Sequence, residues 1–443
     1  MSRVYIAMSA DIIHHGHLRV IEEGVRHIHE NGEFDELIIG LLTDEAVASY
    51  KRIPLLKYAE REAIISAIKG VDKVVPQKSV DYTENLLMYK PNYVIHGDDW
   101  KNGSLSTIRT KVIDLLSQWG GHLIEIPYTK DISSTLLERE SRDLRANPHN
   151  RCSMLRRLLS LKPCISVCEA SNGLSGLIVE NAIYNGPDTD SFREFDCMWL
   201  SSLCDSTFKG KPDIELVDFS SRIQTINEIM EVTSKPMIVD GDTGGRPEHF
   251  AYNIKTLERL GVSAIIVEDK CGPKRNSLFG TEVEQTLEDP YAFASKLVEG
   301  KRSQITKDFM IFARIEALIA GKGIDDALNR AKIYLNEGMC DGVCIHSKEK
   351  DGKEIKEFLI EFRKDFPDVP VILIPTTYNQ YTEEELTEWG ANIIIHANHL
   401  LRSAYPAMMN TAKSILEHHR SKEASESYCM SIKDVLSIIP GEK

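Results

Sequence analysis

Eight short apolar runs between residues 163 and 400 constrain the fold of this chain more than any other feature. They read CISVCEA, FDCMWLSS, PMIVDGD, AIIVEDK, FMIFARIE, GVCIHSK, PVILIPTT and NIIIHAN, and helical patterns separate most of them. Eight β-α units are the number that closes a (β/α)8 barrel, whose active site forms at the carboxyl ends of the strands. We therefore predict such a barrel over residues 163–443, with the polar residues that end the runs around one pocket: Glu169, Ser201, Asp240, Asp242, Glu268, Lys270, Arg314, His346 and Thr376.

Residues 1–140 show a second pattern, in which five apolar runs alternate with helical patterns. The runs are VYIAMSA, ELIIGLL, KVVPQ, YVIHGDD and HLIEIPY. This alternation is typical of a doubly wound, Rossmann-like α/β domain with a parallel sheet. Residues 141–162 are dense in charge and carry no strand pattern, so we expect a linker that leads into a helix, with a break at Asn147-Pro148.

The composition narrows the class of protein. The chain has 443 residues and a net charge of -14, which argues against nucleic acid as a partner. No apolar run approaches the roughly 18 residues that span a membrane, and the N-terminus lacks a signal-peptide pattern. The nine cysteines show no C-x-x-C spacing, so we expect reduced thiols in a cytoplasmic protein.

The motif HHGH follows the first predicted strand, with His14 and His17 on either side of Gly16. A glycine at a helix start lets a ligand approach the backbone, and the helix N-terminus favours phosphate. Imidazoles in this position can donate hydrogen bonds to phosphate oxygens as charge builds up in a transition state. The other interpretation is a pair of surface histidines at a helix start.

Four further motifs accompany HHGH in order: LLTDEA, KYAEREAIISAIKGVDKVV, HGDDWKNG and YTKDISST. Together they make residues 3–137 resemble the cytidylyltransferases of the glycerol-3-phosphate and ethanolamine-phosphate type. The resemblance implies that His14 and His17 bind the triphosphate of CTP and stabilise the transition state. It also implies a set of nucleotide-binding residues: Ser9, Ala10, Asp11, Lys51 or Arg52, Arg61, Asp98, Asp99, Trp100, Ser133, Ser134 and Thr135.

Two departures from that family leave the choice of base open. Ala10 stands where the family commonly has an aromatic residue, and Tyr128 stands where it has an arginine. The predicted site contains phosphate-binding groups but no nucleophile. Such a site suits in-line attack of an acceptor on the α-phosphate, with a divalent ion bound to the triphosphate.

The barrel half has its own chemistry. Asp240 and Asp242 in VDGDTGG share a face of a strand end, and with Glu268 they offer the oxygen ligands that Mg²⁺ prefers. Arg314 and His346 end neighbouring strands and could bind a small carboxylate or phosphate. Asp213, in the loop KGKPDIE, is either a catalytic residue on a mobile lid or a solvated loop acid.

The stretch EDKCGPKRNS, residues 268–277, raises a separate question. Cys271 lies among two acids, two lysines and an arginine, a setting that could lower the pKa of a thiol and make it a nucleophile. It could equally lie beside a metal-and-anion site in which the cysteine is incidental.

These barrel motifs, in this order, make residues 163–440 resemble phosphoenolpyruvate phosphomutase of the isocitrate lyase superfamily. The resemblance implies that Asp240 binds Mg²⁺ directly while Asp242 and Glu268 hold the waters of the metal. Substrate contacts would come from Ser201, Leu203, Arg314 and His346, and catalytic loop residues would be Asp213, Lys274 and Asn276.

The expected function is therefore a bifunctional enzyme of phosphonate biosynthesis that converts phosphoenolpyruvate to phosphonopyruvate and transfers CMP to a small phosphonate such as 2-hydroxyethylphosphonate. The alternatives are a phosphonopyruvate hydrolase, a carbon–carbon lyase and a non-catalytic nucleotide sensor in the N-terminal half. Asn276 occupies the position of the lyase nucleophile, which argues against the lyase. The resemblance also implies a homodimer or homotetramer.

Overall fold

The computed structural model describes residues 3–31, 36–101, 106–127, 142–185, 192–272 and 274–439. The N-terminal part is a five-stranded sheet in the order β3-β2-β1-β4-β5, and every pairing is parallel. Its strands are β1 (Arg3–Met8), β2 (Glu36–Leu42), β3 (Lys73–Gln77), β4 (Tyr93–Gly97) and β5 (His122–Ile126). The predicted doubly wound domain is thus confirmed, and the chain reverses its direction of winding between β1 and β4, where such sheets bind ligands.

Helices follow the strands of this sheet. They are α1 (His15–Asn31), α2 (Asp44–Ala48), α3 (Tyr58–Ser66), α4 (Thr83–Tyr89) and α5 (Ser106–Ser117), together with the short 3-10 helix η1 (Asp98–Lys101). The strands β1 and β2 are buried almost throughout, which is why their sequences are continuous apolar runs rather than alternating ones.

The C-terminal part closes into a barrel of eight parallel strands, as predicted. In chain order these are β6 (Ile165–Glu169), β9 (Cys197–Leu200), β10 (Met237–Asp240), β11 (Ala264–Glu268), β12 (Met310–Ile315), β13 (Gly342–Ile345), β14 (Val371–Leu373) and β15 (Ile393–His396). Each of the eight predicted apolar runs contains one of these strands. A short antiparallel hairpin of β7 (Ile183–Asn185) and β8 (Phe192–Glu194) was not expected, because three-residue strands carry no periodic signal.

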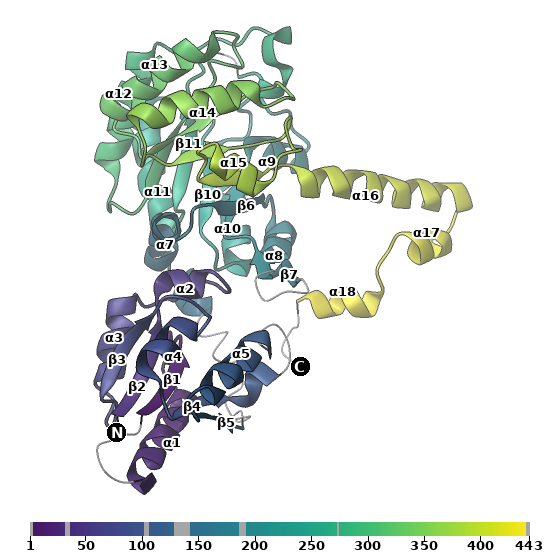
Figure 1. Cartoon of the computed structure of the whole chain (residues 1–443). Coiled ribbons are helices and arrows are strands. Elements are labelled where there is room, and N and C mark those ends of the chain that lie inside the picture. The colour runs from purple at the N-terminus through teal and green to yellow at the C-terminus, as the bar shows by residue number, and fades with distance from the viewer. Residues whose placement is uncertain are drawn as a thin grey trace.

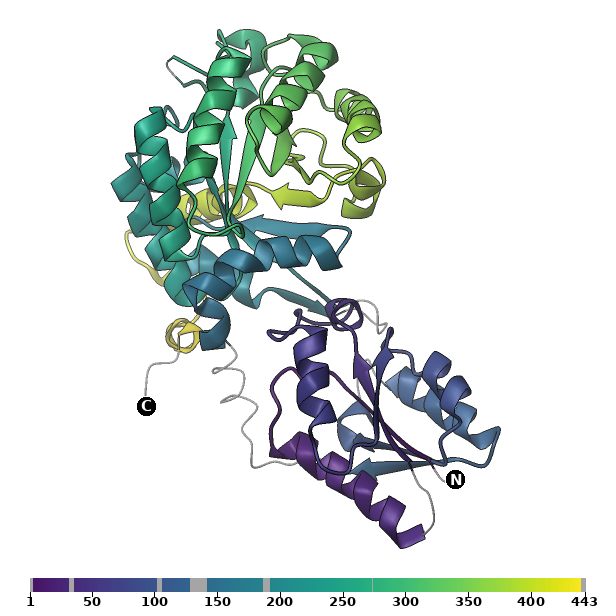
Figure 2. The ribbon, with the colours of Figure 1, turned by 90° about the vertical axis from the view of Figure 1, so that its left-hand side faces the viewer.

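The barrel is surrounded by helices, as Figures 1 and 2 show. They are α8 (Gly173–Asn181), α9 (Ser202–Phe208), α10 (Phe219–Val232), α11 (Pro247–Leu260), α12 (Pro290–Ser303), α13 (Gly323–Asn336), α14 (Lys353–Asp365) and α15 (Glu383–Glu388). Their apolar faces pack on the outside of the strands in one large cluster that includes Phe250, Phe293 and Phe358. A second cluster fills the inside of the barrel.

The segment expected to be a linker contains the helix α7 (Pro148–Leu161), which lies between the two domains (Figure 2). Asn147 caps it by accepting a hydrogen bond from the backbone N–H of His149, and Pro148 occupies its first turn, so the Asn-Pro pair starts the helix. Leu155 and Leu158 of α7 are buried in the cluster inside the barrel, which Ile53 of the N-terminal domain also joins. The helix therefore covers the amino-terminal end of the barrel and joins it to the first domain.

The chain continues into α16 (His399–His418), which projects away from the barrel (Figure 1), then α17 (Lys422–Ser427) and α18 (Ile432–Ile438). Large apolar side chains on this arm are exposed, among them Leu416, Ile432 and Leu436. Over the described part of the chain, no helix combines the length and the apolar character needed to cross a membrane.

Candidate active sites

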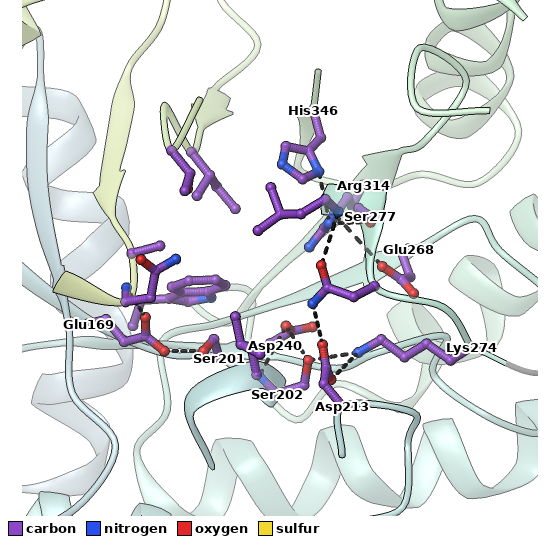
Figure 3. A pocket seen from close by; sticks show the side chains of 18 residues that line it. Glu169, Ser201, Ser202, Asp213, Asp240, Glu268, Lys274, Ser277, Arg314 and His346 are labelled. Carbon is purple, nitrogen blue, oxygen red and sulfur yellow. Dashed lines mark hydrogen bonds and ion pairs between the residues drawn. The ribbon is translucent and has the colours of Figure 1, made fainter. Parts of the chain in front are cut away.

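A pocket opens at the carboxyl ends of the barrel strands (Figure 3). Seven of the nine polar strand-end residues predicted from the sequence line it: Glu169, Ser201, Asp240, Glu268, Arg314, His346 and Thr376. The expected loop residues Asp213, Lys274 and Asn276 line it too, as does Leu203. The closed barrel brings these side chains together because all parallel strands end on the same rim.

Asp240 ends β10 and is held rigidly at the floor of the pocket. Its Oδ2 accepts hydrogen bonds from the backbone N–H and the hydroxyl of Ser202, at 3.2 and 3.0 Å. Its Oδ1 accepts one from the backbone N–H of Asp242, at 3.0 Å. Ser202 was not singled out from the sequence, although it adjoins Ser201 at the start of α9.

Asp242 lies behind the pocket rather than in its lining. Its carboxylate accepts a hydrogen bond from Arg222 Nη1 at 2.7 Å and another from Lys274 Nζ. Burial opposes the charged carboxylate, but Arg222 and Lys274 outweigh it and hold the pKa of Asp242 far below its usual range. Lys270 also stays out of the lining, and it donates to Ser277 Oγ at 2.8 Å.

Three loop residues close the pocket over Asp240. Lys274 Nζ donates to Ser202 Oγ at 2.7 Å and to Asp213 Oδ1 at 3.1 Å, and Asn276 Nδ2 donates to Asp213 Oδ2 at 2.7 Å. Burial disfavours the ammonium of Lys274, yet the surrounding carboxylates outweigh it and raise its pKa above the usual range. Asp213 is therefore tied to two residues of the 274–278 loop and does not behave as a solvated loop acid.

Glu268 ends β11, and its Oε2 lies 3.8 Å from Arg314 Nε. Its Oε1 is buried without a hydrogen bond, and Lys270 Nζ lies 3.4 Å away. Burial raises the pKa of Glu268 to about 7, against the opposing charges of Lys270, Lys274 and Arg314. An underpartnered buried carboxylate opposite the fixed carboxylate of Asp240 fits a hard cation with oxygen ligands, such as Mg²⁺. Within the described ranges, no group of three or more His, Cys, Asp or Glu side chains is arranged to hold a metal ion.

Next to Glu268, the pocket is lined by Arg314, whose Nε lies 3.8 Å from Glu268 Oε2, and by His346. Arg314 Nη2 donates to Ser277 Oγ at 2.8 Å and to His346 Nδ1 at 3.0 Å, and its Nε donates to Glu316. Because a guanidinium has only donors, His346 Nδ1 acts as the acceptor and Nε2 carries the ring proton. Burial and the charge of Arg314 lower the pKa of His346, which agrees with a neutral ring.

Glu316 is the member of this group that the sequence analysis missed. It is fully buried, accepts from Ser277 Oγ at 2.6 Å and holds Arg314 in place. Arg314 outweighs the effect of burial and holds the pKa of Glu316 well below its usual range. Its position two residues after Arg314, on the same face of the strand end, was the available signal.

Ser201 and Cys271 contrast in their relation to the pocket. The Ser201 hydroxyl lines it and donates to the buried carboxylate of Glu169. Cys271 is outside the lining, and its backbone N–H donates to the carbonyl of Thr286 at 2.9 Å. The geometry therefore favours the second interpretation of EDKCGPKRNS, a charged site beside an incidental cysteine.

The N-terminal site lies where α1 starts after β1. The rings of His14 and His17 lie 4.1 Å apart between centroids, and His14 Nδ1 accepts a hydrogen bond from the backbone N–H of Gly16 at 3.0 Å. Burial, followed by His14 and Lys51, lowers the pKa of His17 to about 4. Lys51 Nζ donates to Ser9 Oγ at 2.9 Å, so the structure brings four of the predicted residues together.

The loop between β1 and α1, residues 9–14, is expected to bind nucleotide and is called here the nucleotide loop; its conformation is also constrained. Ala10 is buried and has a φ of 51°, in the left-handed region that is unusual for a residue with a Cβ. Asp11 Oδ1 accepts a hydrogen bond from the backbone N–H of Leu56 at 3.0 Å. Asp11 thus holds the protein backbone in this structure.

Three residues expected to bind nucleotide are engaged elsewhere. Arg61 is fully buried, where it donates to the carbonyl of Ser9 and lies 2.6 Å from Asp44 Oδ1, so its guanidinium holds the loop in this structure. Trp100 is 1% exposed and stacks on His96 at 3.9 Å, which makes it part of the core. Arg52 turns away to the barrel, where it pairs with acids.

The remaining expected residues of this site are placed only in part. Asp98 lies in η1 directly after β4, at the predicted end of the sheet. The side chain of Asp99 lies outside the described residues, as do Ser133, Ser134 and Thr135. They stay predictions.

Two family models match the chain and together cover both domains. A model described as phosphoenolpyruvate phosphomutase matches residues 155–416, and one described as cytidylyltransferase-like matches residues 9–140. The chain belongs to the phosphoenolpyruvate phosphomutase family and carries a cytidylyltransferase-like domain at its N-terminal side, which confirms both resemblances.

Individual relatives cover the barrel half. The phosphoenolpyruvate phosphomutase of Tetrahymena pyriformis is 33% identical over 268 residues, which are 60% of this chain and 84% of the relative. The phosphonopyruvate hydrolase of Variovorax sp. (strain Pal2) is 30% identical over 292 residues, 65% of this chain and 94% of the relative.

Solved structures agree with this assignment. The phosphoenolpyruvate phosphomutase of Streptomyces platensis subsp. rosaceus has a TM-score of 0.59 and 30% identity, covering 65% of this chain and 94% of that chain. A phosphonopyruvate hydrolase solved with oxalate and Mg++ has a TM-score of 0.55 and 28% identity, covering 66% and 94%. These similarities support a mutase in the barrel, and the first domain supports nucleotidyl transfer in general.

Proposed function

We propose that the barrel isomerises phosphoenolpyruvate to phosphonopyruvate in a Mg²⁺-dependent reaction. The observation that carries this proposal is a pocket in which two carboxylates, Asp240 and Glu268, lie together with two hydrogen-bond donors, the guanidinium of Arg314 and the neutral imidazole of His346. Asp240 would be a direct ligand of the metal, and Glu268 would bind its waters. Asp242, which the resemblance also assigns to those waters, lies behind the pocket, where Arg222 and Lys274 hold its carboxylate. Mg²⁺, when bound, would neutralise charge on the phosphoryl group and the carboxylate of the substrate.

The residues of the chain have separate tasks in this reaction. Arg314 and the Nε2–H of His346 would bind the phosphoryl oxygens and spread the charge of a loose, metaphosphate-like group. Ser201 and Leu203 would contact the pyruvate part. Asp213, Lys274 and Asn276 would keep water out of the closed pocket while the enolate turns to present C3, because water would convert the reaction to hydrolysis.

A phosphonopyruvate hydrolase is the second candidate for the barrel, because a hydrolase is among the similar proteins at 30% identity. Phosphorus NMR of the protein with phosphoenolpyruvate, phosphonopyruvate and Mg²⁺ separates the two. A mutase interconverts the substrates, and a chelator stops the reaction until Mg²⁺ is restored. Release of phosphate from phosphonopyruvate without interconversion would establish the hydrolase instead.

For the N-terminal domain we propose transfer of CMP from CTP to a small phosphonate such as 2-hydroxyethylphosphonate, with release of pyrophosphate. His14 and His17 at the start of α1, with Lys51 beside them, support a triphosphate site. Pyrophosphate release is measured with CTP and the other nucleotides against a panel of phosphonates. Binding of CTP without release for any acceptor would favour the nucleotide sensor.

We also propose that the chain assembles into a homodimer or homotetramer in the cytoplasm. The projecting arm supports assembly with a second copy, because Leu416, Ile432 and Leu436 are each more than 70% exposed on it. Light scattering after gel filtration measures the mass. A monomer at micromolar concentration would contradict the proposal, and Leu416→Glu with Leu436→Glu is expected to shift an oligomer toward the monomer.

A further inference from the structure

Three consecutive residues between α2 and α3 make three different attachments. They belong to residues 51–57, called here the clamp segment. Lys51 donates to Ser9 in the N-terminal site, Arg52 pairs with acids of the barrel domain, and Ile53 is 2% exposed in the apolar cluster inside the barrel. The segment that carries a phosphate-binding lysine is therefore anchored on the barrel domain.

Arg52 makes the polar part of this anchor. Its Nε donates to Glu194 of β8 at 2.9 Å, and its Nη1 donates to Glu180 of α8 at 2.9 Å and to Ser234 Oγ at 3.1 Å. Glu180 and Glu194 are both nearly buried as side chains. Burial opposes the charged form of Glu180, yet Arg52 and its neighbours lower the pKa of that carboxyl to about 2.

Two further arginines hold the clamp segment from the chain that leads into the barrel. Arg145 donates to the carbonyl of Ile53 at 2.7 Å and pairs with Asp11 Oδ2 at 3.3 Å. Arg157 of α7 donates to the carbonyls of Leu55 and Leu56, at 2.8 and 3.3 Å. Each is 20% exposed or less as a side chain.

The clamp segment and the nucleotide loop are joined to each other as well. Asp11 accepts the backbone N–H of Leu56, and Arg157 also pairs at 3.1 Å with Asp44, which in turn binds the Arg61 that holds the carbonyl of Ser9. A shift of either barrel-side arginine is thus transmitted to the backbone around Ser9 and Asp11.

We propose that Arg52, Arg145 and Arg157 are positioning residues of the nucleotidyltransferase site, which the barrel side of the chain completes. This inference rests on the proposed function of the N-terminal domain. The matched cytidylyltransferase-like region ends at residue 140, so Arg145 and Arg157 act from outside it. The three arginines fix Lys51 and the nucleotide loop before the triphosphate binds. A displacement of such groups by about 1 Å can lower the reaction rate on the order of 10²-fold.

Two adjacent arginines of α7 provide a matched test. Arg157 faces the clamp segment, whereas Arg156 Nη2 donates to Asp341 of the barrel at 2.9 Å. Arg157→Gln is expected to raise the KM for CTP by about tenfold or more with a smaller change in kcat, since the lost alignment concerns phosphate contacts. Arg156→Gln is expected to keep this KM within about twofold. Mutase activity in the same preparations is expected to stay near wild type.

Hydrogen exchange gives a readout that does not depend on activity. Arg157→Gln is expected to speed exchange of amides in residues 9–12 and 51–57, with no change in β2 or in the barrel strands, whereas Arg156→Gln leaves residues 9–12 and 51–57 as in wild type. Exchange in those two segments equal to wild type would overturn the positioning role, as would an unchanged KM or a parallel loss of both activities. If the wild type shows no nucleotidyl transfer but Arg157→Gln and Arg156→Gln differ in exchange as expected, the proposed function is wrong and the positioning role stands.

Discussion

The two candidate sites of this chain arrange their ionisable groups in opposite ways. In the barrel, charged groups such as Asp242, Lys274 and Arg314 are buried and largely paired with one another. In the N-terminal domain, His14 and His17 are partly exposed, and His17 is shifted toward its neutral form. The charged groups of the barrel pocket are thus already paired with one another, whereas the imidazoles of the N-terminal site are shifted toward their neutral form.

The difference follows from architecture. A closed barrel directs eight strand ends at one point, so opposite charges meet inside a rim of protein. An open sheet offers a crevice with one exposed side, and its ligand groups come from loops that need support. Here the clamp segment and the arginines behind it provide that support.

The largest effect is expected when the carboxylate of Asp240 is neutralised. Asp240→Asn keeps the shape but removes the charge proposed to bind Mg²⁺, so mutase kcat is expected to fall by about 10³-fold or more. Phosphorus NMR measures the rate, and nucleotidyl transfer by the same preparation is the control. A mutase that keeps a tenth of its activity would remove Asp240 from the metal site.

The corresponding change in the open site is His17→Ala. Loss of a donor to the developing charge is expected to lower nucleotidyl transfer by about 10²-fold, without effect on the mutase. Pyrophosphate release measures the rate. If both activities fell together, the two sites of the protein would not be independent of each other.

Lys274→Ala tests how far the barrel relies on paired charge. The substitution leaves Asp213 and Asp242 without a shared cation, so the free energy of unfolding is expected to fall by about 3 kcal/mol. Mutase activity is expected to fall by about 10²-fold, because the pocket no longer closes. Urea denaturation and phosphorus NMR measure the two effects, and Asn276→Ala should lose activity with less loss of stability.

The pH dependence of the N-terminal site sharpens the comparison further. His17 is expected to titrate near pH 4 in the free protein, below the usual 6.5, because burial and the nearby Lys51 disfavour its charged form. The folded protein then binds this proton less tightly than the unfolded chain, so the contribution to stability is complete above pH 6.5 and is lost as the pH falls toward 4. Ring resonances followed by NMR measure the titration. Lys51→Met is expected to raise this pKa, and titration of the wild type near 6.5 would contradict the geometry.

The smallest effect is expected at Cys271, the cysteine among the charged residues of the 268–277 stretch. Cys271→Ala should keep mutase activity within about twofold, because the half-buried side chain lies outside the pocket and substitutions away from a site usually have small effects. A folded but inactive variant would show that the thiol takes part in the reaction.

The sequence predicted most of the barrel site because that site depends on strand ends. Polar residues that terminate apolar runs must meet at one rim once eight strands close, and this placed residues such as Glu169 and His346 correctly in the pocket. Glu316 was missed, although it follows Arg314 by two residues, the same spacing that separates Asp240 and Asp242. Arg61 and Trp100 are buried in the structure, and a motif does not show whether a cationic or aromatic side chain faces the ligand or supports the loop from below, so their nucleotide contacts stay predictions.

By itself, the sequence of this protein determined two domains, a doubly wound sheet followed by a closed barrel, because apolar periodicity and strand count depend on local chemistry. Only the tertiary structure decided that Asp242 and Lys274 pair behind the pocket, that α7 joins the domains, and that Arg52 leaves the nucleotide site for Glu180 and Glu194. The physical reason is that ion pairs and burial are set by distance in space, and these partners are separated by 32 to 142 residues along the chain.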